Sequence, residues 1–266
     1  MRSPVPALLL FAGVCGGGLL RAQSDAAPDV GQQQAMLARI KQSAMRFEGQ
    51  LPDFICTKLT ARFEDSSGSG KKWKRRDELE ETVFFAQNGR TATQLLKLNG
   101  KPTNRSHDSI GGIVENGVVR DAIVPASIFG PLANGQFAWS RWGTLNASFN
   151  ARRTAVFAFM TPRLFKNYPD GTRAYLIGFH GLVYANPEDG MPLRLEVHVD
   201  GPEGYPFQES GWDIDYGTVT IAGRELVLPV KAVARYRVNK LLTRNEIQFT
   251  GYRKYEADSK VTFDNN

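Results

Sequence analysis

The chain has 266 residues, a formal net charge of +6 at pH 7 and only two cysteines, Cys15 and Cys56. A chain of this length can bury a sizeable core without disulfide bonds. After the first 22 residues no run approaches the roughly 20 apolar residues that a membrane-spanning helix needs. We therefore expect no transmembrane segment in the mature chain.

Residues 1–22 have the pattern of an export signal. Arg2 gives a positive start, residues 5–20 carry no charge, and Ala22 is a small residue before a plausible cleavage point. The uncharged run is short, rich in glycine and interrupted by proline, so it is less suited to be a membrane anchor. The sequence predicts a signal peptide over 1–22 and an exported protein, periplasmic or secreted.

Cleavage after Ala22 leaves 31 basic and 27 acidic residues, a net charge of +4, and Cys56 as the single thiol. No internal disulfide bond can then form, and export disfavours nucleic acid as a partner. Lipidation at Cys15 is an alternative, although Val14 puts a β-branched side chain where a small one is usual.

Residues 23–31 are expected to form a flexible leader, followed by a single domain over 32–263. Between residues 32 and 48, apolar side chains recur at spacings of three and four, which predicts an amphipathic helix. The narrow apolar stripe favours packing on a sheet over lying on a membrane surface. The apolar positions are Leu37, Ile40, Ala44 and Phe47.

Beyond Pro52 the period of the pattern changes to two, which is typical of strands. Asn88-Gly89 and Asn99-Gly100 are strong hairpin signals. Cys56 is expected on the outward row of the first strand, under the junction between helix and sheet. The inward row is expected to be Ile55, Leu59, Ala61 and Phe63.

About ten strands with almost no helix between them predict an antiparallel meander rather than parallel βαβ units. The expected fold class is α+β, mainly β. We expect a long curled antiparallel sheet, or half-barrel, with the N-terminal amphipathic helix and a short second helix near 122–129. Such a sheet must bury one face by curling or by packing helices into its concavity.

Cys56 could be a nucleophile only if a base lay beside it in the fold. Of the three histidines, His198 is expected to be solvated on a regular strand, His180 to be packed in the sheet, and His107 to lie in an irregular, glycine-rich region. A buried free cysteine usually acts as a small hydrophobe, so we interpret Cys56 as a packing residue.

Motifs for metals and cofactors are missing from the sequence. It contains no C-x-x-C, H-E-x-x-H or G-x-S-x-G. Asp213 and Asp215 share a strand face but are interpreted as solvated carboxylates. We therefore predict no catalytic residue, no metal and no cofactor.

The most conspicuous charge feature is a basic run that could bind an anionic envelope surface, with a tryptophan as anchor. Four acidic residues follow it within five positions, which favours ordinary cross-strand charge pairing instead. The run consists of Lys71, Lys72, Trp73, Lys74, Arg75 and Arg76.

Five large aromatic residues on two neighbouring predicted strands are the candidate ligand-binding residues. They could fill a core, or they could line an apolar groove in an incompletely closed sheet. Phe137, Trp139 and Arg141 are expected on one face, with Trp142 starting the next. The five candidates are Phe137, Trp139, Trp142, Phe157 and Phe159.

The late strands read G-L-V-Y-A-N-P-E-D-G-M-P-L-R-L-E-V over 181–197 and D-Y-G-T-V-T-I-A-G-R-E-L-V-L-P over 215–229. A turn with an acid and a Gly or Pro, followed by a strand opening with a pair like Leu193-Arg194, resembles the half-barrel envelope superfamily typified by the bacterial outer-membrane lipoprotein carrier. L-P-D-F-I-C-T and F-A-W-S-R-W look like segments of uncharacterised exported bacterial proteins. The superfamily resemblance implies an apolar cavity, lipid or lipoprotein acyl chains as ligands, and no catalysis.

Three functions follow as hypotheses. The first is an exported, non-enzymatic binding protein that holds lipid or acyl chains in a curled sheet. The second is an envelope-associated structural or adhesive protein that binds anionic surfaces. The third, least favoured, is a cysteine-dependent hydrolase.

Overall fold

The computed structural model describes residues 26–86, 90–112, 126–130, 133–145, 152–167 and 172–255. Helix α1 spans Val30–Gln50 and has a capping box: the Asp29 carboxylate accepts from the Gln32 N–H at 2.8 Å, and the Gln32 side chain accepts from the Asp29 N–H at 3.2 Å. These bonds satisfy donors that a helix start leaves open. The helix therefore begins at Val30, slightly before the expected position 32.

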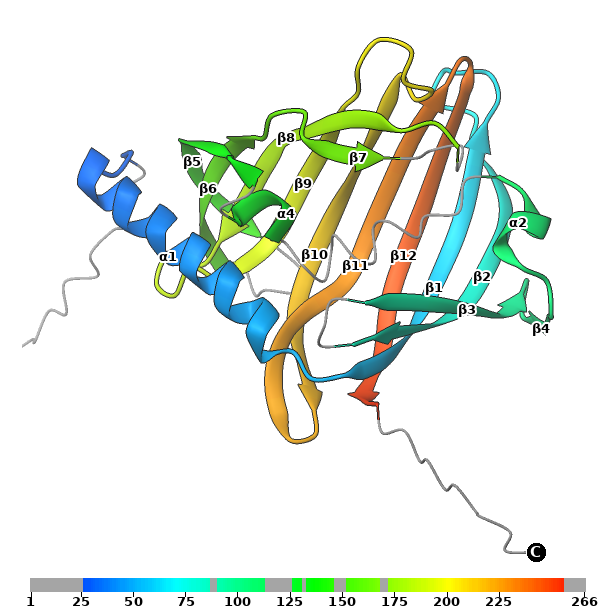
Figure 1. Cartoon of the computed structure of the whole chain (residues 1–266), viewed down its shortest axis with the longest axis horizontal. Coiled ribbons are helices and arrows are strands. Elements are labelled where there is room, and N and C mark those ends of the chain that lie inside the picture. The colour runs from blue at the N-terminus through cyan, green and yellow to red at the C-terminus, as the bar shows by residue number, and fades with distance from the viewer. Residues whose placement is uncertain are drawn as a thin grey trace, which may run out of the picture.

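Twelve strands in the described ranges form one antiparallel sheet, which curls without closing (Figure 1). Its order is β4-β3-β2-β1-β12-β11-β10-β9-β8-β6-β5, and β7 pairs with β8. The last strand therefore lies beside the first, and the mainly β, antiparallel fold is confirmed. In chain order the strands are β1 Phe54–Asp65, β2 Lys74–Phe85, β3 Thr91–Leu98, β4 Lys101–Pro102, β5 Gln136–Leu145, β6 Arg152–Met160, β7 Phe165–Asn167, β8 Tyr175–Ala185, β9 Pro192–Asp200, β10 Glu209–Ile221, β11 Arg224–Val238 and β12 Leu241–Lys254.

The second helix expected near 122–129 is not shown. The structure has only a four-residue turn there, α4 (Ala126–Phe129), and residues 122–125 lie outside the described residues. Another four-residue turn, α2 (His107–Ile110), follows β4. Four residues make about one helical turn, so α1 is the only long helix within the described ranges.

Helix α1 crosses one face of the sheet, called the inner face below (Figure 1). Met36, Ile40 and Ala44 of α1 are buried in the same apolar cluster as the inner-face side chains of the strands. At Gly190, in the turn between β8 and β9, φ is +73° and a Cβ would lie 2.4 Å from the backbone of α1. Only glycine fits this close contact, which seats the helix on the sheet.

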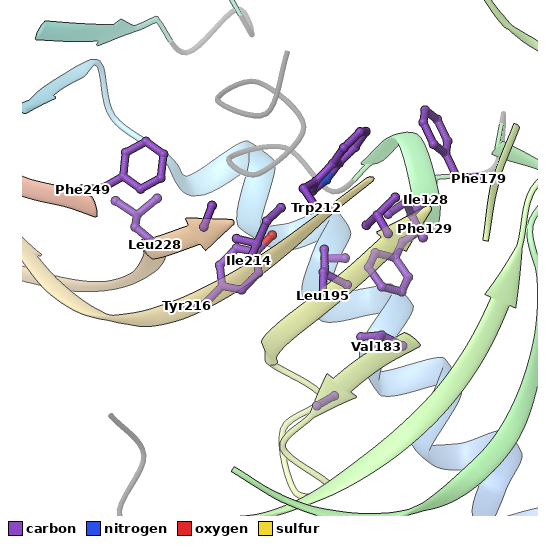
Figure 2. Close-up of a cluster of buried hydrophobic side chains, with 14 of the residues drawn as sticks. Ile128, Phe129, Phe179, Val183, Leu195, Trp212, Ile214, Tyr216, Leu228 and Phe249 are labelled. Carbon is purple, nitrogen blue, oxygen red and sulfur yellow. The ribbon is translucent and has the colours of Figure 1, made fainter. Parts of the chain in front are cut away.

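Large apolar side chains from neighbouring strands meet on the inner face, with α4 packed against them (Figure 2). This cluster positions every candidate ligand-binding residue discussed below. The members of this core cluster that are labelled in the figure are Ile128, Phe129, Phe179, Val183, Leu195, Trp212, Ile214, Tyr216, Leu228 and Phe249.

The row of β1 that faces inward is the opposite of the predicted one. The expected inward residues, Ile55, Leu59, Ala61 and Phe63, are only partly buried. The buried row instead includes two cations, because carboxylates of β2 lie on the same face and pair with them. It consists of Phe54, Cys56, Lys58, Thr60 and Arg62.

Candidate binding face

The five predicted aromatic residues come together on the inner face, where β5 forms the edge of the sheet. Ring centroids lie 5.0 Å apart for Trp139 and Trp142, 5.4 Å for Trp139 and Phe157, and 6.3 Å for Phe137 and Phe159. Phe157 and Phe159 are buried, whereas the three β5 rings are only half-buried and pack against the core. We call these five residues the aromatic ledge.

A β-bulge in β5 assembles the ledge. Trp139 pairs with Phe157, but the next paired residue is Arg141, opposite Val156, so Ser140 is the extra residue. The bulge turns Trp142 to the same face as Trp139. Arg141 turns to the outer face, where its Nη2 donates to the Tyr184 hydroxyl at 2.9 Å. The prediction that Arg141 shares a face with Phe137 and Trp139, with Trp142 on the next, was therefore wrong.

Two cations lie over the rings of the ledge. Lys41 Nζ of α1 is 4.8 Å from the Phe137 centroid, and Arg153 Cζ is 3.7 Å from the Trp142 centroid. Both distances suit cation–π attraction. The Trp142 indole N–H also donates to the Ala26 carbonyl at 2.9 Å, so the chain before α1 lies against the ledge.

A second feature of the inner face is a buried ionic cluster between β1, β2 and α2. Lys58 Nζ lies 3.1 Å from Glu81 Oε2, and both side chains are 0% exposed. Glu81 Oε1 lies 2.7 Å from His107 Nε2. Burial by itself raises the pKa of Glu81, but the His107 hydrogen bond and the Lys58 charge outweigh burial and hold that pKa below its ordinary value.

A bidentate ion pair extends this cluster. Arg62 donates to both carboxylate oxygens of Asp77 at 2.6 Å and to the Gly111 carbonyl at 2.8 Å. These bonds tie the end of α2 to β1. Because each of these charges has a close partner, the cluster reads as an anchor for α2 rather than as a catalytic group.

Three of the six side chains in the basic run 71–76, those of Trp73, Arg75 and Arg76, make local contacts. Arg76 Nη1 pairs with Glu64 of β1 at 2.6 Å, and Arg75 contacts Glu78 within β2. The Trp73 indole donates to the Gly70 carbonyl. Charge pairing does form around the run, but the cross-strand partner of Arg76 is Glu64 and not one of the four acidic residues that follow the run. Binding of an anionic surface is unsupported.

The Asp65 carboxylate organises the turn before this run. It accepts from the hydroxyls of Ser67 and Ser69 and from the backbone N–H groups of Ser67, Lys71 and Lys72. Lys74 follows as the exposed first residue of β2.

Cys56 is buried and lies against Tyr252. Burial raises the pKa of the Cys56 thiol to about 12, despite a hydrogen bond with Tyr252 that acts in the opposite direction. A thiol in this state is not a ready nucleophile. His107 contacts Glu81 instead, so the structure gives the hydrolase hypothesis no nucleophile–base pair among the described residues.

His180 and His198 form a pair that the sequence analysis missed. Both are exposed on the outer face, and their rings stack at 5.1 Å between centroids. The prediction that His180 is packed in the sheet was wrong. Plain hairpin spacing from the β8–β9 turn would pair His180 with Val197. A register shift at Tyr184/Ala185 brings His180 opposite His198 instead, and alternation in the sequence does not show such a shift.

The described residues form neither a metal-binding cluster nor a membrane-spanning helix. No group of three or more His, Cys, Asp and Glu side chains there is arranged to hold a metal ion. None of the helices described is long and apolar enough to cross a membrane.

No protein-family model matches the chain, and no curated protein matches it. Among solved structures, the chain is similar to a domain described as an outer membrane lipoprotein-sorting protein from Vibrio parahaemolyticus (10% identity, 85% of this chain and 95% of that chain, TM-score 0.38). It is also similar to a DUF1329 family protein from Desulfovibrio piger (7% identity, 85% and 95%, TM-score 0.38). A third similarity is to the MucA/MucB complex of Pseudomonas aeruginosa (10% identity, 84% and 100%, TM-score 0.23).

Proposed function

We propose that this protein is an exported, non-enzymatic binding protein that holds lipid or lipoprotein acyl chains against the inner face of its curled sheet. The observation that carries the proposal is the aromatic ledge, whose three β5 rings, Phe137, Trp139 and Trp142, are half-buried at the edge strand of an open sheet. Apolar surface left in water at such a place is what an acyl chain would cover.

The physical basis is removal of apolar area from water. Each Å² covered contributes about 25 cal/mol, and each methylene buried about 0.8 kcal/mol, so a few methylenes against Trp139 and Trp142 suffice for measurable binding. Binding of this kind needs no reacting group. The burial and raised pKa of Cys56 are in keeping with a non-enzymatic role.

The test is displacement of a fluorescent fatty-acid probe, together with mass spectrometry of lipids that co-purify with the protein. We expect Trp139→Ala to weaken probe binding by about tenfold, because it removes a large apolar contact at the centre of the ledge. Trp73→Ala is the matched control, since Trp73 lies on β-hairpin surface away from the ledge, with Arg244 over its ring. Equal affinities of the two variants, or folded protein without bound lipid and without competitive displacement, would refute the proposal.

The inner face away from the ledge favours the second hypothesis, a structural protein with a filled core. Leu195 and Ile214 are 0% exposed and Tyr216 is 2% exposed. If the core is filled throughout, the probe will not bind. Neutralising 71–76 should then abolish any salt-sensitive binding to anionic vesicles.

A further inference from the structure

Four residues on the outer face lie directly opposite one another across neighbouring strands. Met160 of β6 pairs with His180 of β8, His180 pairs with His198 of β9, and His198 pairs with Gly211 of β10. Directly opposed residues in antiparallel strands point to the same face, with Cα atoms about 4.5–5.5 Å apart. A thioether and two imidazoles therefore stand side by side, and we call Met160, His180 and His198 the Met–His–His row.

The row is open to solvent. Met160 is 53% exposed and the His180 side chain is 50% exposed. The two imidazole rings stack at 5.1 Å with 17° between their planes. Because Gly211 has no side chain, His198 stays uncovered on that side, where a hollow of about 440 Å³ is lined by both histidines and Asp200.

A carboxylate orients one of the imidazoles. His180 Nδ1 lies 2.9 Å from Asp200 Oδ1. A carboxylate in this position holds the proton on Nδ1 and leaves Nε2 as a free electron-pair donor, the arrangement usual behind metal-bound histidines. The carboxylates of Glu209 and Asp213 also line the hollow and are paired with Arg237 and Arg235, so Asp200 is the charge that acts on the row.

We propose that the Met–His–His row binds a copper ion, taken up as Cu(I) by the Met160 thioether and the imidazoles of His180 and His198. Thioether sulfur is a soft ligand that selects Cu(I), and imidazole is a good ligand for copper. Zinc instead prefers four ligands drawn from Cys, His and carboxylates. No three or more His, Cys, Asp and Glu side chains in the described part of the chain are arranged to hold a metal ion, so a site here needs the thioether as a ligand.

The sheet places the three side chains next to one another. Because the imidazole rings stack with only 17° between their planes, they turn about their side-chain bonds to aim a nitrogen each at one ion. The two histidines are held by the backbone ladder between β8 and β9, and Met160 by the ladder between β6 and β8. The unbranched methionine side chain has three rotatable bonds, so its sulfur can reach an ion above the imidazole of His180.

The experiment is an anaerobic titration of the purified protein with Cu(I), in competition with a chromogenic Cu(I) chelator. We expect one Cu(I) per chain, and at least about tenfold weaker binding in Met160→Leu, which keeps the size and removes the sulfur. His180→Asn and His198→Asn should each abolish competition. Met45→Leu is the matched control, since Met45 of α1 is 44% exposed and lies outside the row.

Circular dichroism of each variant confirms folding, and the two histidine variants are independent, so a folding defect in one leaves the other to decide. No competition by the wild-type protein, an unchanged affinity in Met160→Leu, or equal losses in Met160→Leu and Met45→Leu would each overturn the proposal. Tighter binding of Zn²⁺ than of Cu(I) would overturn it as well.

Discussion

Replacing Glu81 by leucine is expected to destabilise the protein by about 3–5 kcal/mol, the usual loss when one partner of a buried ion pair is removed. This loss of stability lies at the upper end of the range for single substitutions. Lys58 and Glu81 are both 0% exposed and 3.1 Å apart, so the Lys58 ammonium cannot turn to water once its carboxylate is gone. His107 also loses its partner, but at 19% exposed it can be hydrated.

Two further variants test the reasoning. Lys58→Met should cost less than Glu81→Leu, because Glu81 keeps the His107 hydrogen bond. The double variant Lys58→Met with Glu81→Leu should recover most of the loss, since no charge is left unpaired in the core. Glu80→Gln is the control: Glu80 pairs with Lys97, which is 41% exposed, and the expected cost is below about 1 kcal/mol.

Urea denaturation followed by circular dichroism measures these free energies of unfolding. The reasoning fails if Glu81→Leu costs no more than Glu80→Gln. It also fails if the losses of the two single variants simply add in the double variant, because residues that interact must show a coupling energy.

Three other outcomes follow from the structure. Hydrogen bonds, chiefly from the Ser67 hydroxyl, hold the pKa of Asp65 well below its usual value. The stabilising contribution of Asp65 is therefore fully present above about pH 4, the usual aspartate pKa, and is lost as pH falls further. The urea midpoint should depend less on acid pH in Asp65→Asn than in the wild-type protein, and an unchanged dependence would contradict this. Gly190→Ala should destabilise the protein by more than about 3 kcal/mol, because the new Cβ would meet the backbone of α1. Gly223→Ala is the control: φ is similar, at +76°, but the space around it is open, so strain alone should cost about 1 kcal/mol. Equal shifts in melting temperature for the two variants would rule the contact out. Cys56, with a pKa raised to about 12, should react slowly with iodoacetamide at pH 8 until urea unfolds the protein. Mass spectrometry measures the labelling, and fast labelling of Cys56 in the folded protein would revive the hydrolase hypothesis.

Local patterns in the sequence predicted the parts of the fold that local physics controls. Spacings of three and four residues give α1, and alternation with Asn-Gly and similar turns gives the antiparallel strands. Asp29 and Gln32 also form a capping box that a reader of the sequence could have used to start the helix at Val30.

Contacts between distant residues decided the candidate sites. The extra residue Ser140 moves Trp142 onto the aromatic ledge, and alternation along β5 cannot show a bulge. Lys58 lies in the core because Glu81 faces it from the next strand, although the sequence pattern of β1 alone placed its apolar residues inward. The sequence determined which segments become helix and strand, since those preferences are set within a few residues. Only the tertiary structure decided which face of each strand is buried and which side chains meet, because cross-strand register depends on partners as distant as β1 and β12.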